Sequence, residues 1–291
     1  MLTGVVLDPG RVMEWPARPI SIDTPVRVAV ITVNYNTRLL IAQLIYSLYG
    51  RLGKEQLAQL LVVDNASTDG SRELLERMAG SGLCELIVND GQRYHGPALN
   101  QAMNRLAEQE EVGILTRHID YVWVLDSDCV IIRPDTLTEA TRALQRSGAA
   151  LAGQASANQW HAEETIGLFS LLFDPSQVWR DPIPPFEDSG EPSLSLQLGC
   201  AGAGLSRIEF PFTHDGYLVH RGRSTLAEVV SRGETANKHY RWAVDHHEPH
   251  FNAEPGAVDL YQVSQAEFAA TCRDLESDDA IVRACLSLSE R

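Results

Sequence analysis

The sequence predicts an α/β fold built on a mainly parallel sheet flanked by helices. Short runs rich in β-branched residues alternate with segments whose apolar residues recur at helical spacing. The first four of these runs each stop at polar, turn-forming residues, as strands do where they pass into loops. The 291 residues are 44% hydrophobic and 22% charged, a composition that can bury one large globular core.

The first half of the chain shows this alternation most clearly. Residues 26–33 (VRVAVITV) form a β-branched run bounded by Pro25 and Asn34, which predicts a buried strand, and Leu40 and Leu44 then begin a helical spacing. Further strands are expected at residues 59–63, 84–88 and 121–125, with a helix around 74–78 and another that starts at Pro97 and passes Leu106.

The second half is less regular. A helix is expected around residues 137–144 and a short strand at 149–153. Residues 174–193, rich in Pro, Asp and Glu, are predicted to form a mobile loop, and a strand at 217–220 would deliver His220 to a glycine-containing turn. The remaining expected elements are a helix around 194–198, a helical and then irregular stretch at 226–250, and a final amphipathic helix from Gln265.

Charge and cysteine usage restrict the partners and the compartment. The formal net charge of -15 argues against a nucleic-acid backbone as a partner. The five cysteines are scattered and include no Cys-X-X-Cys pair, which favours reduced thiols and a cytoplasmic protein. The chain does not open with a basic flank and a long apolar run, and no window approaches about 18 uninterrupted apolar residues, so neither a signal peptide nor a membrane span is expected.

Four polar turns follow the four expected strands. Asn34, Asp64, Asn89 and Asp126 each come after a strand, and ligands of parallel sheets bind beyond the carboxyl ends of the strands. Asp126 and Asp128 follow an apolar run (YVWVL) and are separated by one residue, which makes a compact anionic site of the kind that binds divalent ions near phosphate groups. The alternative for this pair is two solvated turn aspartates.

Four segments in this half resemble family 2-like glycosyltransferases with the GT-A fold, and especially their rhamnosyltransferase-like branch. The segments are residues 33–36 (VNYN), 62–71 (VVDNASTDGS), 89–100 (NDGQRYHGPALN) and 125–128 (LDSD). A looser similarity continues through residues 191–194, Gly202 and residues 220–224. The resemblance implies a Rossmann-like fold that transfers a sugar from a nucleotide-diphosphate donor to an acceptor hydroxyl, with inversion at the anomeric carbon.

The resemblance also implies a metal site. A diphosphate leaving group requires charge neutralisation, which Mn²⁺ or Mg²⁺ held by a carboxylate supplies. By its position in the family pattern, Asp128 is the expected metal ligand, while Asp126 would touch the ribose or a metal-bound water. His220 resembles a histidine that often completes the metal site in this fold, with a structural or solvated role as the alternative.

The nucleotide pocket is expected at the first two polar turns. Asp64 resembles the family residue that reads the edge of the nucleobase, although it could also cap a helix that starts near Ser67. Val33, Asn34 and Asn36 lie where the family lines the nucleotide pocket, with simple turn chemistry as the alternative for the two asparagines.

Two further polar segments each have more than one possible role. Arg93 and His95 precede an expected helix start, where they would either face the diphosphate or form an exposed loop pair. Residues 245–250 (DHHEPH) favour acceptor binding or a loop hydrogen-bond network over a second metal site, because Pro249 interrupts a continuous helix through the histidines.

Inverting transfer requires a carboxylate that takes the proton of the attacking hydroxyl. The acidic segment 187–191 (EDSGE) precedes an expected helix in the acceptor half, where the family places this base. Counting back from Leu194 favours Glu191 as the base, and Asp188 is the competitor. The segment lacks the family's Glu-Asp-X-Asp-Leu pattern, so the choice between the two stays open, as does the alternative of a solvated acidic loop.

Together these observations predict a single GT-A domain. An irregular lead-in at residues 1–25 precedes a nucleotide-sugar-binding half at 26–135 and an acceptor-binding half with C-terminal helices at 136–291. The expected activity is metal-dependent, inverting glycosyl transfer to a soluble small molecule or glycan. A nucleotidylyltransferase and a non-catalytic sugar-nucleotide- or glycan-binding module are the alternatives, and the sequence leaves open whether the chain forms a homo-oligomer.

Overall fold

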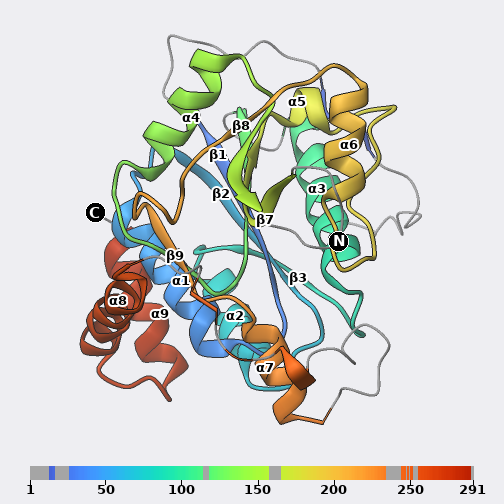
Figure 1. The fold of residues 1–291 in the computed structure, drawn as a ribbon. Helices are drawn as coiled ribbons and strands as arrows, with labels where there is room; N and C mark the ends of the chain where they lie inside the picture. Colours follow the sequence, from blue (N-terminus) through green and yellow to red (C-terminus); the bar gives the residue numbers. More distant parts are fainter. Residues whose placement is uncertain are drawn as a thin grey trace.

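A seven-stranded sheet lies between layers of helices (Figure 1) in the part of the chain that the computed structural model describes, residues 13–16, 26–113, 118–156, 165–233, 244–246, 248, 250–251 and 255–289. Its strands are β1 (Val28–Asn34), β2 (Leu57–Asp64), β3 (Glu85–Val88), β4 (Tyr121–Leu125), β6 (Leu151–Ser156), β7 (Thr165–Phe173) and β8 (Arg207–Glu209). A two-stranded sheet joins β5 (Cys129–Ile131) to β9 (Leu218–His220). The helices are α1 (Arg38–Arg51), α2 (Ser71–Gly80), α3 (His95–Glu111), α4 (Thr136–Ser147), α5 (Pro175–Val178), α6 (Leu194–Gly202), α7 (Ser224–Ser231), α8 (Ala257–Cys272) and α9 (Asp278–Ser289).

The central sheet has the strand order β3-β2-β1-β4-β7-β6-β8. The first four strands in this order are parallel to one another, and β6 is parallel to β8. Strand β7 runs antiparallel to both of its neighbours, β4 and β6. Because β6 and β7 are consecutive antiparallel strands, no crossover helix is needed between them. The mostly parallel α/β sheet predicted from the sequence is confirmed.

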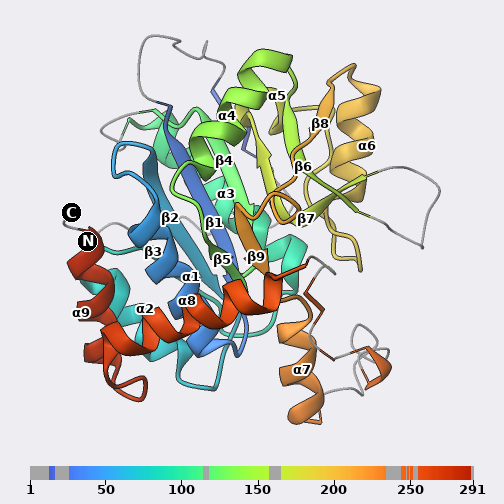
Figure 2. The same ribbon diagram turned by 60° about the vertical axis from the view of Figure 1, so that its left-hand side comes forward.

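Strands of this sheet divide their side chains between two cores. Along β1, Val28 and Val30 pack on one face while Ala29 and Ile31 pack on the other, as the two-residue period of a strand requires. Helices α1, α2, α4 and α9 pack on the first face, and α3 and α6 pack on the second (Figure 2). Since both faces are apolar, polar groups concentrate where the strands end. This arrangement places a polar site at the carboxyl ends of β1, β2 and β4.

The second half differs most from the sequence predictions. Residues 174–193, expected to form a mobile loop, contain α5 and are anchored by the buried side chains of Trp179, Ile183 and Phe186. Strands β5, β7 and β8 were not predicted at all. Strands β5 and β8 have three residues each, which is too short for a periodic pattern to identify them.

Helix boundaries also differ at several points. The final amphipathic helix expected from Gln265 is two helices, because α8 begins earlier, at Ala257, and α9 follows it after a turn. Helix α3 begins at His95, two residues before the expected start at Pro97. None of the helices in the described part of the chain is both long and apolar enough to cross a membrane.

Candidate active site

Buried polar side chains hold the ends of β1 and β2 together. Asn34 donates from Nδ2 to Oδ2 of Asp64 at 2.9 Å and to Oγ of Ser67 at 3.0 Å. The other carboxylate oxygen of Asp64 accepts the backbone N–H of Ser67 at 3.0 Å. Asn34 and Asp64 are both fully buried. Asp64 therefore organises the turn after β2, and the suggested cap of a helix near Ser67 is wrong, because α2 begins only at Ser71.

Asn36 ties the turn after β1 to the turn after β2. Its backbone has a left-handed φ of 53°, which asparagine tolerates better than most residues. Its Oδ1 atom accepts the N–H of Thr68 at 2.7 Å, and its own N–H donates to Oγ of Ser67 at 2.9 Å. These bonds fix the turns that carry Tyr35 and Asn65, two residues that line a cavity.

Strand β4 delivers two carboxylates to the same edge of the sheet. The strand is buried throughout, and the N–H of Asp126 just beyond it donates to the carbonyl oxygen of Phe169 on β7 at 3.0 Å. A tight turn follows, in which the N–H of Cys129 donates to the carbonyl oxygen of Asp126 at 3.1 Å. Asp126, Ser127 and Asp128 in this turn all line the cavity.

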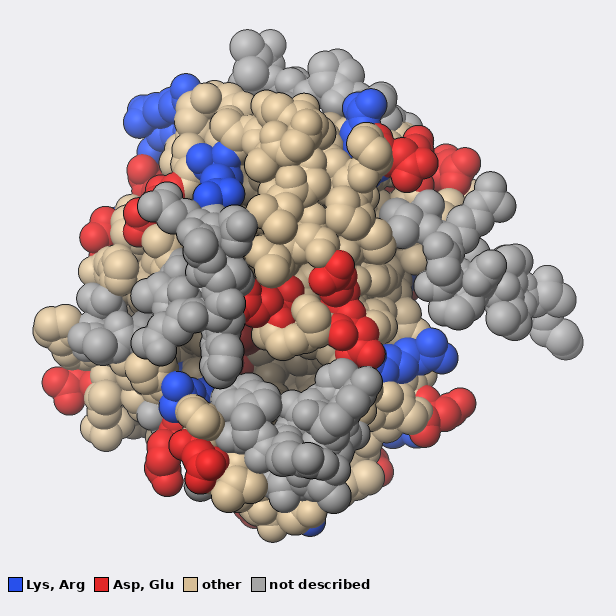
Figure 3. All heavy atoms as spheres, turned by 45° about the vertical axis from the view of Figure 1, so that its right-hand side comes forward, with Lys and Arg blue, Asp and Glu red and all other residues tan. Residues whose placement is uncertain are grey.

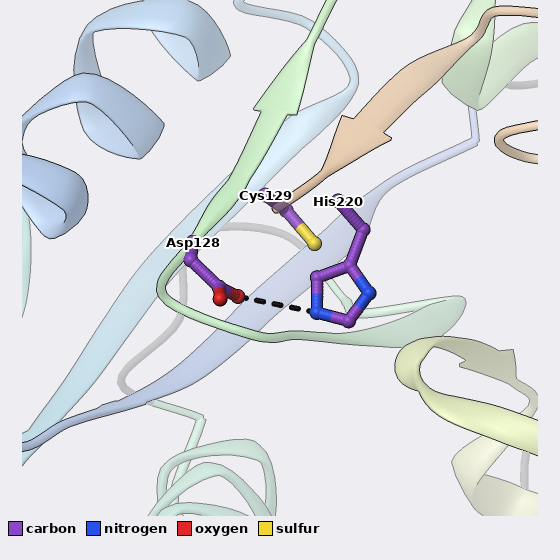
Figure 4. Close-up of side chains that lie close together, drawn as sticks. All are labelled: Asp128, Cys129 and His220. Carbon is purple, nitrogen blue, oxygen red and sulfur yellow. Dashed lines mark ion pairs between the residues drawn. The ribbon is translucent and has the colours of Figure 1, made fainter. Parts of the chain in front are cut away.

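His220 reaches these carboxylates from β9. That strand pairs antiparallel with β5, in a register that sets His220 opposite Cys129 and beside Asp128. The Nε2 atom of His220 lies 3.2 Å from Oδ1 of Asp128 and 3.4 Å from Oδ2 of Asp126, and Figure 4 shows the His220 ring and the Asp128 carboxylate facing each other. The imidazole also stacks on Phe169, with ring centroids 4.5 Å apart. Strand pairing therefore assembles a site whose residues are distant in sequence.

Burial and charge act in opposite directions on this pair. Burial alone lowers the pKa of His220, but the charge of Asp128 and hydrogen bonds to Asp126 and Asp128 outweigh it and raise the pKa to about 10. Burial raises the pKa of Asp128, while the charge of His220 and hydrogen bonds from His220 and Ser224 lower it to about 2. In the absence of a metal ion the two side chains therefore form a buried ion pair at neutral pH.

Cys129 lies close to this pair but is a poor metal ligand. Its Sγ atom is within 4.8 Å of ligand atoms of Asp128 and His220 (Figure 4). Burial, together with the charges of Asp128 and Asp126, raises the pKa of the thiol well above its ordinary value, and the thiol donates to the carbonyl oxygen of Phe169 at 3.4 Å. Because Mg²⁺ and Mn²⁺ prefer carboxylate oxygens to thiolates, the ligand set that suits such an ion is two aspartates and one histidine.

The turn from β9 into α7 brings backbone N–H groups to Asp128. Gly222 and Arg223 have left-handed φ values of 68° and 60°, and α7 starts at Ser224, whose backbone N–H and hydroxyl both donate to Asp128. A Cβ on Gly222 would lie 2.8 Å from the carbonyl oxygen of His250, so this close approach requires glycine. Arg223 and Ser224 line the cavity, where a helix start and a guanidinium favour an anion.

The start of α3 forms another wall of the cavity. Tyr94 has φ 60° and ψ 176°, a conformation found almost only at glycine. Asn65 holds this backbone, because its Nδ2 donates to the carbonyl oxygen of Tyr94 at 3.3 Å and its Oδ1 accepts the N–H of Arg93 at 2.9 Å. Tyr94 and His95 both line the cavity, and Nε2 of His95 lies 3.8 Å from Oδ1 of Asp126.

The acidic segment 187–191 forms a further wall. Asp188, Ser189 and Gly190 line the cavity, whereas Glu191 does not. The cavity has a volume of about 520 Å³. Acidic side chains gather around a hollow near the middle of one face of the molecule (Figure 3). Of the two candidate bases, the fold brings Asp188 to the cavity.

Only some of the residues predicted for the site line the cavity. The cavity is lined by Val33, His95, Asp126, Asp128 and Asp188. Five predicted residues are not part of this lining: Asn34, Asn36 and Asp64, which are buried, and Arg93 and Glu191. His220 contacts both aspartates but is not part of this lining. The side chains of His246 and His250 are exposed and lie outside the lining, and His247 and Pro249 fall outside the described residues.

Sequence reasoning missed several residues of the cavity. Asn65 lies inside the VVDNASTDGS segment and Arg223 and Ser224 lie inside the HRGRS segment, so both motifs carried a signal that was not assigned to these residues. Tyr94 lies inside the NDGQRYHGPALN segment, but its backbone conformation is one that sequence patterns associate with glycine, so it was not assigned to the cavity.

Comparisons with known proteins agree with this arrangement. Residues 29–165 match the model of glycosyl transferase family 2. The chain is similar in structure to the mannosyltransferase PcManGT from Pyrobaculum calidifontis in complex with GDP-Man and Mn²⁺, with 19% identity, coverage of 94% of this chain and 78% of that chain, and a TM-score of 0.50.

Two other solved structures are similar to a lesser degree. One is TarS from S. aureus in complex with UDP-GlcNAc, with 14% identity, 91% of each chain covered and a TM-score of 0.47. The other is glucosyl-3-phosphoglycerate synthase from Mycobacterium tuberculosis with Mn²⁺, UDP and glucosyl-3-phosphoglycerate, with 15% identity, 71% of this chain and 80% of that chain covered, and a TM-score of 0.45. No curated protein matches the chain.

The family match and the fold lead to the same assignment. The matched residues 29–165 contain all of β1 except its first residue, β2 to β4, and the turn with Asp126 and Asp128. The similarity to the P. calidifontis enzyme extends the fold over 94% of the chain. Residues 29–165 therefore match glycosyl transferase family 2, and the chain has the GT-A fold.

Proposed function

We propose that the protein is a metal-dependent, inverting glycosyltransferase that moves a sugar from a nucleotide-diphosphate donor to an acceptor hydroxyl. The observation that carries the proposal is the contact of His220 with Asp126 and Asp128, two carboxylates that line the same cavity as Asp188. The first three residues offer ligands for a cation, and the fourth offers a carboxylate for a proton. An inverting transferase needs both functions in one cleft.

The ligand set fits Mn²⁺ or Mg²⁺. Both ions favour carboxylate oxygens, and Oδ1 of Asp126 is buried without a hydrogen-bond partner among the described residues. The distances of 3.2 and 3.4 Å from Nε2 of His220 to the two carboxylates are close to the roughly 3 Å between neighbouring ligands of an ion bound at about 2.1 Å. When bound, such an ion would neutralise charge on the diphosphate as it leaves.

The diphosphate of the donor is proposed to lie between these ligands and the start of α7. Arg223 contributes a guanidinium there, and the first turn of α7 contributes the positive end of the helix dipole. His95, at the start of α3, faces the same space from the other side. GDP-Man and Mn²⁺, the ligands of the P. calidifontis mannosyltransferase, belong to the classes proposed here.

The nucleoside is proposed to lie at the ends of β1 and β2. Val33, Tyr35 and Asn65 line this part of the cavity. Asn34 and Asp64 support the wall from beneath through their buried hydrogen bonds. A direct contact between Asp64 and the nucleobase stays a prediction.

Asp188 is the proposed general base, with Glu191 as the competitor. Asp188 is exposed and lines the cavity, so a hydroxyl group can reach it. In the proposed step the acceptor oxygen bonds to the anomeric carbon as the bond to the diphosphate breaks. The electron pair leaves on the phosphate oxygen, and the hydroxyl proton passes to the Asp188 carboxylate.

The acceptor and the compartment are also proposals. The lining of the cavity contains Gln92 and Ser189 in addition to Asp188, and these hydrogen-bonding side chains support a soluble small molecule or glycan as acceptor. The five cysteines are all free thiols, which supports the cytoplasm as the compartment.

A donor screen followed by product stereochemistry tests this function. Binding of UDP, GDP and dTDP is measured by calorimetry with Mn²⁺ and with EDTA, and the corresponding sugar donors are then tested for transfer. We expect one nucleoside diphosphate to bind only with Mn²⁺, and NMR to show a product whose anomeric configuration is opposite to that of the donor. Binding that is equally tight in EDTA, or retention of configuration, would contradict the proposal.

A further inference from the structure

We propose that Asn100 is a positioning residue that sets the place of Asp188 in the cavity. The inference rests on the proposed function, because it assigns a support to the proposed base. Segment 187–191 belongs to no helix or strand, so the position of Asp188 depends on what holds the ends of this segment. Two contacts with α3 provide that support.

The first contact is a pair of hydrogen bonds between the side-chain amide of Asn100 and the backbone of Phe186. The Oδ1 atom of Asn100 accepts the N–H of Phe186 at 3.0 Å, and its Nδ2 donates to the carbonyl oxygen of Phe186 at 2.8 Å. An amide that binds both backbone groups of one residue fixes the position and the direction of the chain there. The ring of Phe186 is buried, with its centroid 6.0 Å from that of Trp179. Phe186 is therefore held both by its backbone hydrogen bonds to Asn100 and by the packing of its side chain.

The second contact lies one helical turn earlier, at Gly96. A Cβ on Gly96 would lie 1.9 Å from the carbonyl oxygen of Glu187, so the loop backbone rests directly on the helix backbone. Gly96 and Asn100 are four residues apart and therefore share one face of α3. On its other side, the N–H of Glu187 donates to the carbonyl oxygen of Pro192 at 2.9 Å, which closes the loop around Asp188.

Helix α3 connects this anchor to the metal-binding end of the cavity. It begins at His95, whose Nε2 atom lies 3.8 Å from Oδ1 of Asp126. The same helix therefore fixes the distance between the proposed base and the aspartates of the turn after β4. A misplacement of about 1 Å in a reacting group can cost on the order of 100-fold in rate. Loss of the Asn100 contact should therefore slow turnover without weakening donor binding.

The chain offers a matched pair of variants for the test. Asn100→Asp keeps the shape and the acceptor for the N–H of Phe186 but removes the donor to its carbonyl oxygen. Asn104→Asp makes the same chemical change one turn further along α3, where Oδ1 of Asn104 accepts the N–H of Met13. Binding of UDP, GDP and dTDP with Mn²⁺ is measured by calorimetry. Turnover is measured as release of nucleoside diphosphate from UDP-glucose, GDP-mannose and dTDP-rhamnose.

We expect Asn100→Asp to lower kcat by about 10- to 100-fold, as for a misplaced reacting group, with the Kd of the nucleoside diphosphate unchanged within about twofold. Asn104→Asp should leave both quantities unchanged. A parallel loss of kcat and of nucleotide affinity in Asn100→Asp would indicate general damage to the fold and overturn the inference.

Asp188→Asn separates a failure of this inference from a failure of the proposed function. Asp188→Asn should nearly abolish turnover, and adding Asn100→Asp to it should have no further effect, because the two residues act as a unit. Unchanged turnover in Asp188→Asn would overturn the choice of base. Native turnover in Asn100→Asp beside an inactive Asp188→Asn would overturn the role of Asn100.

Amide hydrogen exchange decides the contact itself even if none of the three donors is turned over. Residues 186–192 should exchange faster in Asn100→Asp than in Asn104→Asp. Equal exchange in the two variants would overturn the inference.

Discussion

The Nε2 atom of His220 lies 3.2 Å from Oδ1 of Asp128 because β9 pairs with β5, the strand that follows Asp128 directly. The pairing register, and not a local motif, therefore assembles the candidate metal site. The turn after β9 adds two hydrogen bonds from Ser224 to the same carboxylate. This relationship links the stability of the metal-free protein to the chemistry of the site.

The stability of the metal-free protein should depend on pH through this pair. The pKa of His220 rises from about 6.5 in the unfolded chain to about 10 in the fold, so its contribution is complete below about pH 6.5 and is lost as the pH rises toward about 10. The pKa of Asp128 falls to about 2, so its contribution is present above about pH 4 and is lost as the pH falls toward about 2.

Urea unfolding in EDTA of the native protein and of His220→Gln checks this dependence. The difference in free energy of unfolding between the two should be largest between about pH 4 and 6.5 and should shrink by about pH 9. A difference that grows between pH 6 and pH 9 would show that His220 does not carry the proton.

Cys129→Ala should leave Mn²⁺ affinity unchanged within about twofold, because the thiol donates to the carbonyl oxygen of Phe169 and Mn²⁺ prefers carboxylate oxygens to thiolates. His220→Gln should weaken Mn²⁺ binding at least tenfold by removing a ligand, a loss of about 1.4 kcal/mol. Calorimetric titration with MnCl₂ in the presence of saturating nucleoside diphosphate compares the two variants. A loss in Cys129→Ala as large as that in His220→Gln would make the thiol a ligand after all.

Gly96→Ala should destabilise the protein by about 1–3 kcal/mol, because the added methyl group overlaps the carbonyl oxygen of Glu187 and displaces the loop. Gly91→Ala is the matched control, since a Cβ there meets nothing within 4 Å. Its effect should stay within about 0.5 kcal/mol. Urea unfolding measures both, and equal effects would mean that the loop does not rest on α3.

Tyr94→Gly should be more stable than Tyr94→Ala by about 1 kcal/mol or more, which reverses the usual order of these two residues. The reason is that φ 60° with ψ 176° is free of strain only for glycine. Thermal unfolding of the two variants under the same conditions decides the point. A more stable alanine variant would show that the backbone at this position is not strained.

Local patterns were sufficient to predict where the polar turns lie. Asn34, Asp64 and Asp126 each end a β-branched or apolar run, and the structure places all three at the carboxyl ends of parallel strands. The same patterns could not distinguish a residue that lines the cavity from one beneath it. Asp64 and Asp126 have the same type of side chain after the same type of strand. Asp64 is buried and accepts hydrogen bonds from Asn34 and Ser67, whereas Asp126 lines the cavity.

The other site residues could not be predicted from local patterns, because long-range strand pairing and irregular loops set their positions. His220 was chosen from a family resemblance, because nothing in the three residues of β9 specifies its pairing with β5. The preference for Glu191 over Asp188 rested on counting back from an expected helix, and that count cannot follow a loop whose path is set by Asn100 and Gly96. Tertiary contacts therefore decided which acidic residue reaches the cavity.

In the proposed function, Asp128 and His220 hold a divalent ion beside the donor diphosphate. Electron paramagnetic resonance of Mn²⁺ bound to the protein labelled with ¹⁵N-histidine, in the presence of the nucleoside diphosphate that binds, tests it most directly. We predict a histidine-nitrogen coupling in the native protein that disappears in His220→Gln, and Mn²⁺ binding at least about tenfold weaker in Asp128→Asn. Native Mn²⁺ affinity in Asp128→Asn, or a spectrum without histidine coupling in the native protein, would contradict the account.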